Sequence, residues 1–471
     1  MNATISTANP AYAKRWKALF VLCTAQFMVI MDTSIIGVAL PAIQEALGYS
    51  QANLQWIFNA YVIFFGGLLL LGGRLSDLFG ARKIFITGFA ILALASLLAG
   101  FAWSEAAMNT GRAIQGLGSA LIAPAALALL MSMFTDPKEL GKALGFWGAS
   151  AAAGGSAGVF LGGVLTEWLT WNWVFLINVP LAIAVIFASP ALLLPGTRQK
   201  GKVDILGAAL VTSALVLVVY AIVTGEQAGW FSVQTLGLII ISALLLGFFL
   251  WLQTSKKQPL VPIQIFKRFN LSAANVVMML LAGAWIPLWF YLNLYLQQVL
   301  QFSALNSGLA LLPMTLAIMV MMVVITGKLV GKYGFKPILV AGLLVLATAL
   351  FLFATVPVGG TFVMNVLPAS LIAAAGMSLA YIPATIASMM GAKPEETGLA
   401  SGLVNTSYQI GSAIGLAVVV AIASAKISNE LSSGLGQMEA YNGAFQTAFF
   451  AAAIIAVLSA IIALVFVKTP K

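Results

Sequence analysis

The sequence predicts an all-α protein that crosses a membrane many times. Three observations support this prediction: 61% of the 471 residues are apolar, only 8% are charged, and the mean hydropathy is +1.04. A water-soluble fold must cover its outside with polar and charged side chains, and this chain has too few of them. The apolar residues also gather in stretches of about 20 or more, which is the length a helix needs to cross a bilayer. The short alternating segments of a transmembrane β-barrel are absent from the sequence.

Fourteen membrane-spanning helices are expected from stretches that hold at most one charge. Ten stretches fit one span each: 18–44, 46–73, 84–104, 106–135, 143–166, 168–197, 205–225, 227–255, 397–425 and 440–467. Two longer stretches, 269–327 and 337–392, fit two spans each, with breaks expected at 301–306 and 357–361. An even number of spans places both ends of the chain on one side.

The positive charges predict which side that is. If the N-terminus lies inside, all but two of the 23 Lys and Arg residues fall in inner segments. The exceptions are Lys426, in an outer loop, and Arg112, within a span. Because Lys and Arg are retained on the cytoplasmic side, we expect both termini in the cytoplasm. The net charge of +10 is then a signal of topology, and it gives no support to a nucleic-acid partner.

An internal repeat is visible in two places. Residues 73–83 and 327–337 share Gly, Leu, Gly and a basic residue at an offset of 254. The glycines of the fifth span recur in the thirteenth at an offset of 257: Gly145, Gly154 and Gly158 match Gly402, Gly411 and Gly415. The second span therefore matches the tenth, a shift of eight rather than six. This predicts two six-helix halves, 1–194 and 257–471, separated by two inserted helices in 195–256.

Several motifs resemble those of the major facilitator superfamily, and in particular its branch of fourteen-helix drug:proton antiporters. Residues 31–43 are similar to the first-helix signature of this branch, and residues 73–83 resemble the loop motif of the whole superfamily. Residues 112–118 resemble the basic motif associated with proton coupling. Residues 145–163 resemble the antiporter motif, although Val159 stands where exporters usually have proline. Residues 171–180 complete the set, with Asn172 where arginine is common.

The resemblance covers nearly the whole chain and implies a function. It implies proton-coupled export of amphipathic, cationic drugs or toxic compounds by alternating access, with the proton gradient as energy source and no cofactor. Such a protein would be a multi-pass protein of a bacterial inner membrane, surrounded by lipid and working as a monomer. Because of Val159, an uptake symporter or facilitator of the same fold stays open as an alternative.

Asp32 and Arg112 are the candidate proton-coupling residues. Asp32 is the only acidic residue well inside a span, and a carboxylate at membrane depth indicates function by default. It lies nine residues before Pro41, roughly 13 Å at the rise of a helix, which places it in the outer half of the membrane. Arg112 lies at an overlapping depth. Burial disfavours a charged carboxylate whereas a nearby arginine favours it, so a pair that forms and separates would switch proton affinity. A static structural ion pair is the alternative.

The 73–83 segment is the candidate gating loop. Gly73 and Gly80 are expected to permit a tight turn, and Asp77 to pair with a basic group or a helix N-terminus in the outward-facing state. Gly331 replaces this carboxylate in the second copy. Arg82 is also a topology signal.

The antiporter motif consists of Gly145, Gly154, Gly158, Gly162 and Gly163. Small residues at this spacing let membrane helices approach closely, so plain tight packing is an alternative to a gating role.

A substrate cavity is predicted from one face of the ninth span. Asparagine at both ends of this face argues against lipid exposure, and Trp and Met suit a cationic, irregular ligand. The candidates are Asn275, Met278, Trp285, Trp289 and Asn293, with Gln115 and Tyr381 from other spans.

An embedded enzyme or a receptor is the alternative from another class. The chain has no histidine, a single cysteine (Cys23) and no clustered carboxylates, so the sequence offers no catalytic or metal site.

Overall fold

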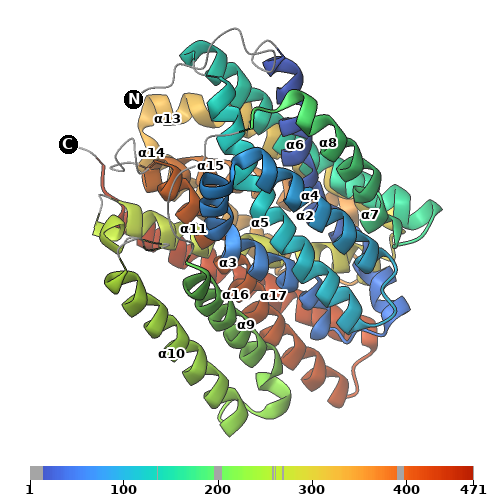
Figure 1. The fold of residues 1–471 in the computed structure, drawn as a ribbon. Coiled ribbons are helices and arrows are strands. Elements are labelled where there is room, and N and C mark those ends of the chain that lie inside the picture. The colour runs from blue at the N-terminus through green and yellow to red at the C-terminus, as the bar shows by residue number, and fades with distance from the viewer. Residues whose placement is uncertain are drawn as a thin grey trace.

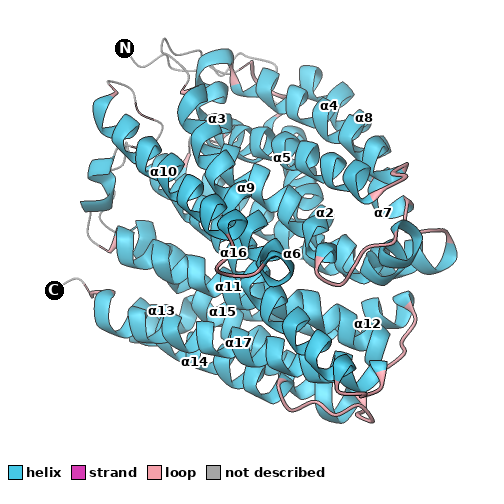
Figure 2. Cartoon of the chain, turned by 90° about the horizontal axis from the view of Figure 1, so that it is seen from below, coloured by secondary structure: helices cyan, strands magenta, loops and turns pink. Residues whose placement is uncertain are grey.

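The structure is a computed structural model that describes residues 14–134, 136–195, 204–256, 270–389 and 397–469, together with 259, 261 and 263–267. Within these ranges the chain forms helices and loops and no strand (Figures 1 and 2). The predicted lysines and arginines at 198, 200, 202, 257, 268, 393 and 471 lie outside the described residues.

Fourteen helices in the described ranges are long and apolar enough to cross a membrane, as the sequence predicts. In order they are α2 (Arg15–Leu47), α3 (Trp56–Phe79), α4 (Ala81–Gly100), α5 (Glu105–Met133), α6 (Pro137–Trp168), α7 (Trp173–Leu176) with α8 (Asn178–Leu192), α9 (Ile205–Ala228), α10 (Val233–Ser255), α11 (Leu271–Leu294) with η3 (Tyr295–Val299), α12 (Ala304–Val320) with η4 (Met321–Thr326) and α13 (Gly327–Tyr333), α14 (Phe335–Phe353), η5 (Phe362–Val366) with α15 (Leu367–Met389), α16 (Thr397–Ser432) and α17 (Gln437–Phe466). Short 3₁₀ turns precede α3 (η1, Asn53–Gln55) and α11 (η2, Ile263–Lys267).

Both long stretches break near the predicted places. The first breaks between Val299 and Ala304, and the second between Phe353 and Phe362. Ser303 ends the first break because its hydroxyl accepts a hydrogen bond from the N–H of Asn306 and so caps α12. Because fourteen is even, Arg15 and Phe466 lie at the same end of the bundle. We call this the terminal end, and the opposite one the far end.

The predicted turn at residues 73–83 is shorter than expected. The helix α3 continues through Gly73 to Phe79, so Gly73 is not part of the turn, which corrects the prediction. Only Gly80, with a φ of 94°, interrupts the chain between α3 and α4, and its repeat counterpart Gly334 has a φ of 82°. Left-handed backbone of this kind favours glycine, so both repeats use the same residue for the same turn.

The matched glycines of the repeat make matched helix contacts. A Cβ added at Gly158 of α6 would lie 2.7 Å from the Ser34 side chain of α2, and Gly154 and Gly162 meet the backbone of α2 in the same way. In the second half, Gly411 and Gly415 of α16 meet the backbone of α11 at Met279 and Gly283. The pair α2–α6 thus corresponds to α11–α16. This supports the division into two halves, whose exact boundaries stay a prediction.

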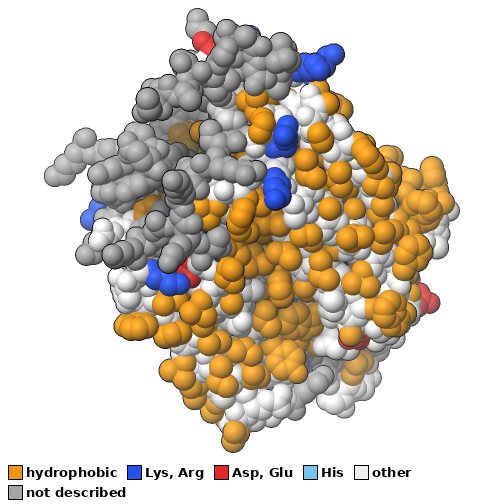
Figure 3. All heavy atoms as spheres, viewed as in Figure 1, with side chains coloured by type: hydrophobic (Ala, Val, Ile, Leu, Met, Phe, Trp, Pro, Cys, Tyr) orange, Lys and Arg blue, Asp and Glu red, His pale blue; other side chains and the backbone are white. Residues whose placement is uncertain are grey.

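The inserted helices α9 and α10 lie on one flank of the bundle (Figures 1 and 2). The helix α9 packs against α3 and α16, where Gly67 leaves room for Thr212, and α10 packs mainly on α9. The outward face of α10 carries exposed apolar side chains such as Leu244 and Trp251. Hydrophobic side chains cover most of the described face in Figure 3, as the lipid contact of a membrane protein requires.

The two halves meet at the far end. Gly163 of α6 lies against the backbone of Ala304, and Gly308 of α12 lies against the carbonyl of Val159. At the terminal end two glycines of these spans make no such contact. A Cβ added at Gly145 of α6 or at Gly331 of α13 would have no described neighbour within 4 Å. The structure is therefore closed between α6 and α12 at the far end, whereas Gly145 and Gly331 make no such close contact at the terminal end.

Candidate functional site

Asp32 and Arg112 form an ion pair in the interior of the first half. Arg112 Nη1 lies 2.6 Å from Asp32 Oδ2, and the two side chains are 0% and 1% exposed. The helix α2 continues past Pro41 to Leu47, so Asp32 lies close to its middle, and the depth of Asp32 in the membrane stays a prediction. Taking two charges out of water is costly unless they pair and find further hydrogen bonds. The surroundings of the pair supply those bonds.

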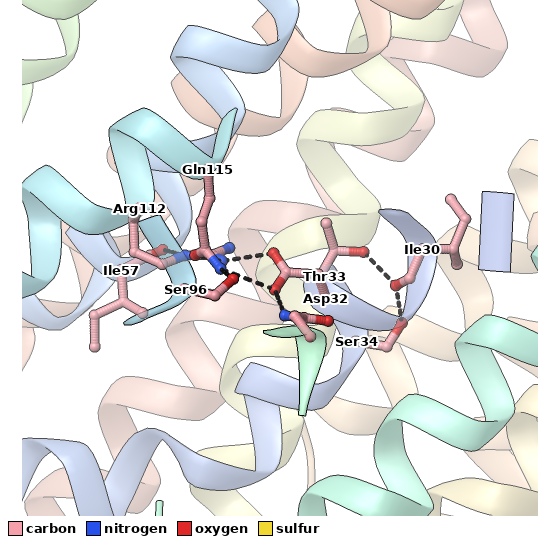
Figure 4. A network of polar contacts seen from close by, with 9 residues as sticks. Ile30, Asp32, Thr33, Ser34, Ile57, Ser96, Arg112 and Gln115 are labelled. Atoms are coloured by element: carbon pink, nitrogen blue, oxygen red, sulfur yellow. Dashed lines mark hydrogen bonds and ion pairs between the residues drawn. The ribbon is translucent and has the colours of Figure 1, made fainter. Parts of the chain in front are cut away.

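Four further groups complete the network around this pair (Figure 4). Asp32 Oδ1 accepts hydrogen bonds from Asn178 Nδ2 at 2.7 Å and from Gln115 Nε2 at 3.3 Å. Gln115 also donates to Ser96 Oγ at 2.7 Å, and its carbonyl oxygen accepts from Arg112 Nη1 at 2.6 Å. Arg112 Nε donates to the carbonyl of Ile57 at 2.9 Å. The carboxylate is thus held from α5 and α8 while the guanidinium is held from α3.

The far side of the guanidinium faces aromatic rings. Its central carbon lies 4.4 Å from the ring centre of Tyr61 and 5.9 Å from that of Phe175. Arg112 Nη2 and Asn178 Oδ1 are buried and have no hydrogen-bond partner among the described residues. Buried polar atoms without a partner are uncommon in folded proteins, so both atoms need an explanation.

The predicted gating residues are separated from this network. Asp77 is exposed on the last turn of α3, one turn after Arg74, whose charge acts on it. Arg82 donates to the carbonyl oxygens of Pro190 and Leu193 at 3.3 and 3.0 Å. A cation at the C-terminus of a helix satisfies carbonyl groups that lack an intrahelical partner. Arg82 therefore ties the start of α4 to the end of α8.

The antiporter-motif glycines divide into three groups. Gly154, Gly158 and Gly162 allow α6 to lie directly on α2, close to Asp32. Gly163 contacts α12 of the other half. Gly145 faces open space, so it takes no part in close helix packing in this conformation, contrary to expectation.

Most of the predicted cavity wall is buried in this conformation. Asn275 accepts a hydrogen bond from Ser407 of α16 at 2.9 Å, Met278 is fully buried, and Asn293 lies against Gly37 of α2. Of the five predicted cavity residues on α11, only Trp289 is partly exposed, and it forms an edge-to-face pair with the buried Trp285. The seventh candidate, Gln115, belongs to the Asp32 network.

Tyr381 of α15 is partly exposed and forms an edge-to-face pair with Tyr408 of α16, with ring centres 5.7 Å apart. Tyr408 was not among the candidates. The role of the seven predicted residues in binding substrate stays a prediction.

Two cavities lie elsewhere. One, of about 430 Å³, is apolar and lies between α3, α5 and α9, lined among others by Trp56, Phe64, Ile114 and Val216. The other, of about 540 Å³, is a polar groove at the far end, lined among others by Gln44, Gln297, Gln298 and Tyr441.

The sequence missed Asn178, Ser96 and Tyr61 as members of the network. All three are buried polar residues inside apolar spans. That property was visible in the sequence, but it is shared by many serines, threonines and asparagines of this chain. Asn178 had the strongest signal because it belongs to the motif at residues 171–180.

Comparisons with known proteins agree with this architecture. The sequence profile of the Major Facilitator Superfamily matches residues 22–416. The puromycin resistance protein pur8 of Streptomyces alboniger is 34% identical over 85% of this chain and 80% of its own length. The cephamycin export protein CmcT of Amycolatopsis lactamdurans is 35% identical over 84% of this chain and 82% of its own. The methylenomycin A resistance protein of Bacillus subtilis is 31% identical over 84% of each chain.

Solved structures share the fold. The POT family transporter PepTSo superposes with a TM-score of 0.69 at 17% identity, over 96% of this chain and 97% of its own. A bacterial homologue of the human lysosomal transporter Spinster, in an inward-facing and unoccupied conformation, gives a TM-score of 0.69 at 15% identity, over 98% of this chain and all of its own. With a profile that matches most of its length, this chain belongs to the major facilitator superfamily and is a membrane transporter, not an enzyme.

Proposed function

We propose that this protein exports amphipathic, cationic compounds from the cytoplasm in exchange for protons. The single observation that carries the proposal is the buried Asp32–Arg112 pair. A carboxylate at this depth offers a proton site, and its pairing with a guanidinium gives that site two states, paired and separated. The arrangement needs no cofactor, because the proton gradient is the energy source.

The direction of transport is inferred from the relatives. The names of three of them refer to resistance or export of small antibiotics, namely puromycin, cephamycin and tetracenomycin C. These compounds differ from one another, which fits a transporter that accepts several small molecules. The cationic preference rests on the carboxylate of Asp32 and on the aromatic and methionine side chains of α11 and α15.

The orientation follows from the basic residues of the sequence. With both termini in the cytoplasm of a bacterial cell, the terminal end is the inner end of the bundle in the inner membrane. Because α6 and α12 are in contact at the far end, which would face the outside, we assign the structure to the inward-facing state. Alternating access would close the terminal end and open the far end around a site near Asp32. We expect the protein to work as a monomer in lipid.

Asp77 is proposed to stabilise the opposite, outward-facing state. It is exposed on the last turn of α3, at the terminal end, where a basic group or a helix N-terminus would pair with it in the other state. Gly331, its counterpart in the repeat, has no carboxylate and cannot contribute in this way.

Uptake by symport is the second candidate, and one observation favours it. Val159 stands where exporters have proline, and α6 runs as a continuous helix from Pro137 to Trp168. A proline would have removed a hydrogen bond and kinked the helix at that point.

One experiment separates the two candidates. Purified protein in weakly buffered detergent is mixed with ethidium, a monovalent lipophilic cation, and the pH is recorded. An antiporter releases protons when the cation binds, whereas a symporter takes them up. We expect release in the wild type and in the control Glu430→Gln, which removes an acid at the far end, and no release in Asp32→Asn. Proton uptake by the wild type, or release that persists in Asp32→Asn, would reject the proposal.

A further inference from the structure

We propose that Asn178 is a positioning residue that switches from donor to acceptor when Asp32 binds a proton, and so transmits the protonation state of α2 to α8. This inference rests on the proposed role of Asp32 as proton carrier. It concerns a residue to which sequence reasoning gave no role.

The orientation of the Asn178 amide is fixed by charge. Its Nδ2 donates to Asp32 Oδ1 at 2.7 Å, and an ionised carboxylate can only accept hydrogen bonds. The amide oxygen points the other way, is buried, and has no hydrogen-bond partner among the described residues. Asn178 is the first residue of α8, and the side chain is fully buried.

Protonation of Asp32 turns one carboxylate oxygen from a hydrogen-bond acceptor into a donor. Oδ2 is held by the guanidinium of Arg112, so the proton is expected on Oδ1, which then becomes a donor facing the Asn178 N–H. The new O–H needs an acceptor, but the amide groups of Asn178 and Gln115 both face Oδ1 with donors. Rotation of the amide by 180° removes the conflict because the carbonyl oxygen of Asn178 then accepts from Asp32. The proton stays on Asp32, and no covalent bond of Asn178 changes.

Asn178 can rotate at little cost, whereas Gln115 cannot. Rotation of Asn178 gives up no hydrogen bond of its amide oxygen, because that oxygen has none. Gln115 Oε1 accepts from Arg112 Nη1 at 2.6 Å, and its Nε2 donates to Ser96 at 2.7 Å. Rotating Gln115 would place its NH₂ group against the guanidinium. The network therefore contains one fixed amide and one amide that is free to switch.

Few charged groups act on this switch. The titratable or charged side chains that face Asp32 are Arg112 of α5 and Tyr61 of α3. Among the other helices packed here, α4 and α6 carry charges only near their ends, and α8 carries none. Asp32 is thus the one acid whose protonation this amide can report.

The position of Asn178 explains how rotation of its amide would affect α8. It stands at the junction of α7 and α8, and the other end of α7 is anchored by Asn172, which donates to the Gly100 carbonyl at 2.6 Å. Because the Asn172–Gly100 bond holds the start of α7, a change in the Asn178–Asp32 bond would move the start of α8 relative to α7. Through Arg82 the other end of α8 is tied to α4.

Infrared difference spectroscopy of the purified protein between neutral and acid pH tests this directly. In the wild type we expect a protonated-carboxyl C=O band to appear together with a shift of a side-chain amide C=O band. Asp32→Asn should lose both changes. Asn178→Leu should keep the carboxyl band and lose the amide shift. The control Asn442→Leu should keep both, because Asn442 is also a buried asparagine with one donated bond, to Val356 O at 3.2 Å, and an unpaired oxygen.

Because misfolding of Asn178→Leu would also abolish the amide shift, transport by a second variant, Asn178→Thr, is measured as well. A hydroxyl can rotate from donor to acceptor, so Asn178→Thr should keep pH-driven ethidium transport within about threefold, whereas Asn178→Leu should lose about tenfold or more, the effect of one hydrogen bond to a charged group. A carboxyl band without any amide shift in the wild type would overturn the inference and leave the proton-carrier proposal intact. So would an amide shift that persists in Asn178→Leu. Absence of the carboxyl band itself would instead reject the proton carrier, and the switch with it.

Discussion

At the scale of single residues, Asp32 and Arg112 form the centre of the site, and polar side chains of α4, α5 and α8 surround the carboxylate. Asp32 and Arg112 stood out in the sequence because charges at membrane depth are rare and must find partners. Ser96 and Asn178 are uncharged, and the sequence contains many similar residues that only bond to their own helix, such as Thr24, whose hydroxyl donates to the carbonyl of Phe20. Which of them turns toward Asp32 depends on packing between helices, which the sequence does not show.

The glycines beside this site give a residue-scale prediction. Gly158→Ala should lower stability by about 1 to 3 kcal/mol, because the new methyl group would lie 2.7 Å from the Ser34 Cβ and 3.0 Å from the Met31 carbonyl oxygen. Gly145→Ala is the matched control in the same helix and the same motif. It meets nothing described within 4 Å and gains helix propensity, so its stability should be equal or slightly higher.

Thermal unfolding of the two variants in detergent would measure the difference. Equal loss of stability in both would mean that α6 does not lie on α2 as described.

At the scale of elements, hydropathy predicted the fourteen spans and both internal breaks, but not the ends of individual helices. The helix α3 extends through Gly72 and Gly73 to Phe79, because glycine is tolerated within membrane helices where a neighbour packs closely. At Gly72 that neighbour is the backbone of Ala120 in α5. The interruption between α7 and α8 was also missed, since residues 168–197 are apolar throughout and hydropathy alone cannot locate a bend.

The inserted hairpin is closed at its terminal end by Asp204. Its carboxylate caps α9 through the Gly207 N–H at 2.8 Å, accepts from Gln253 at 2.8 Å, and pairs with Lys256 beyond α10. Burial raises the pKa of Asp204, but the hydrogen bonds from Lys256, Gln253 and Gly207 outweigh it, so the pKa lies below its ordinary value. A carboxyl group with a depressed pKa stabilises the fold above its unfolded-state pKa of about 3.9 and loses that contribution as the pH falls through the folded-state pKa.

Asp204→Asn should therefore destabilise the protein at pH 7, by about 2 kcal/mol for bonds to a charged group. The difference from the wild type should shrink as the solution is acidified below the pKa of the folded carboxyl group. Unfolding midpoints across this pH range provide the measurement, with Glu45→Gln, an exposed acid at the far end, as a control expected to change little. A difference that stays constant with pH would show that the carboxylate charge is not what closes the hairpin.

At the scale of the whole molecule, the two halves are joined at the far end by neutral amides. Gln298 of η3 donates to Gln44 at 3.1 Å and accepts from Gln51 at 2.9 Å, and Gln297 donates to the Val38 carbonyl at 2.8 Å. The sequence predicted that two halves exist, from the repeat, but it gave no sign of which end would be closed. A state of this kind is set by small differences in contact energy between two arrangements.

Gln298→Ala should shift the molecule toward a conformation open at the far end. It removes two hydrogen bonds between the halves, each worth about 0.5 to 1.5 kcal/mol, so the equilibrium should move by roughly fivefold or more. Gln301→Ala is the control, since that side chain bonds only within its own half, to the Gln298 carbonyl.

Distances between spin labels at Gly145 of α6 and Lys328 of α13, both at the terminal end, would report the shift as a shorter separation. A distance distribution unchanged by Gln298→Ala would show that these amides do not hold the far end closed.

Transport by reconstituted vesicles would show whether Asp32 carries the proton that drives transport. A pH gradient is imposed across vesicles that contain the wild type, Asp32→Asn or the control Glu430→Gln, and ethidium movement is followed by fluorescence. We expect uphill ethidium transport against the proton flow in the wild type and in Glu430→Gln, and none in Asp32→Asn. Undiminished pH-driven transport by Asp32→Asn would contradict this role of Asp32.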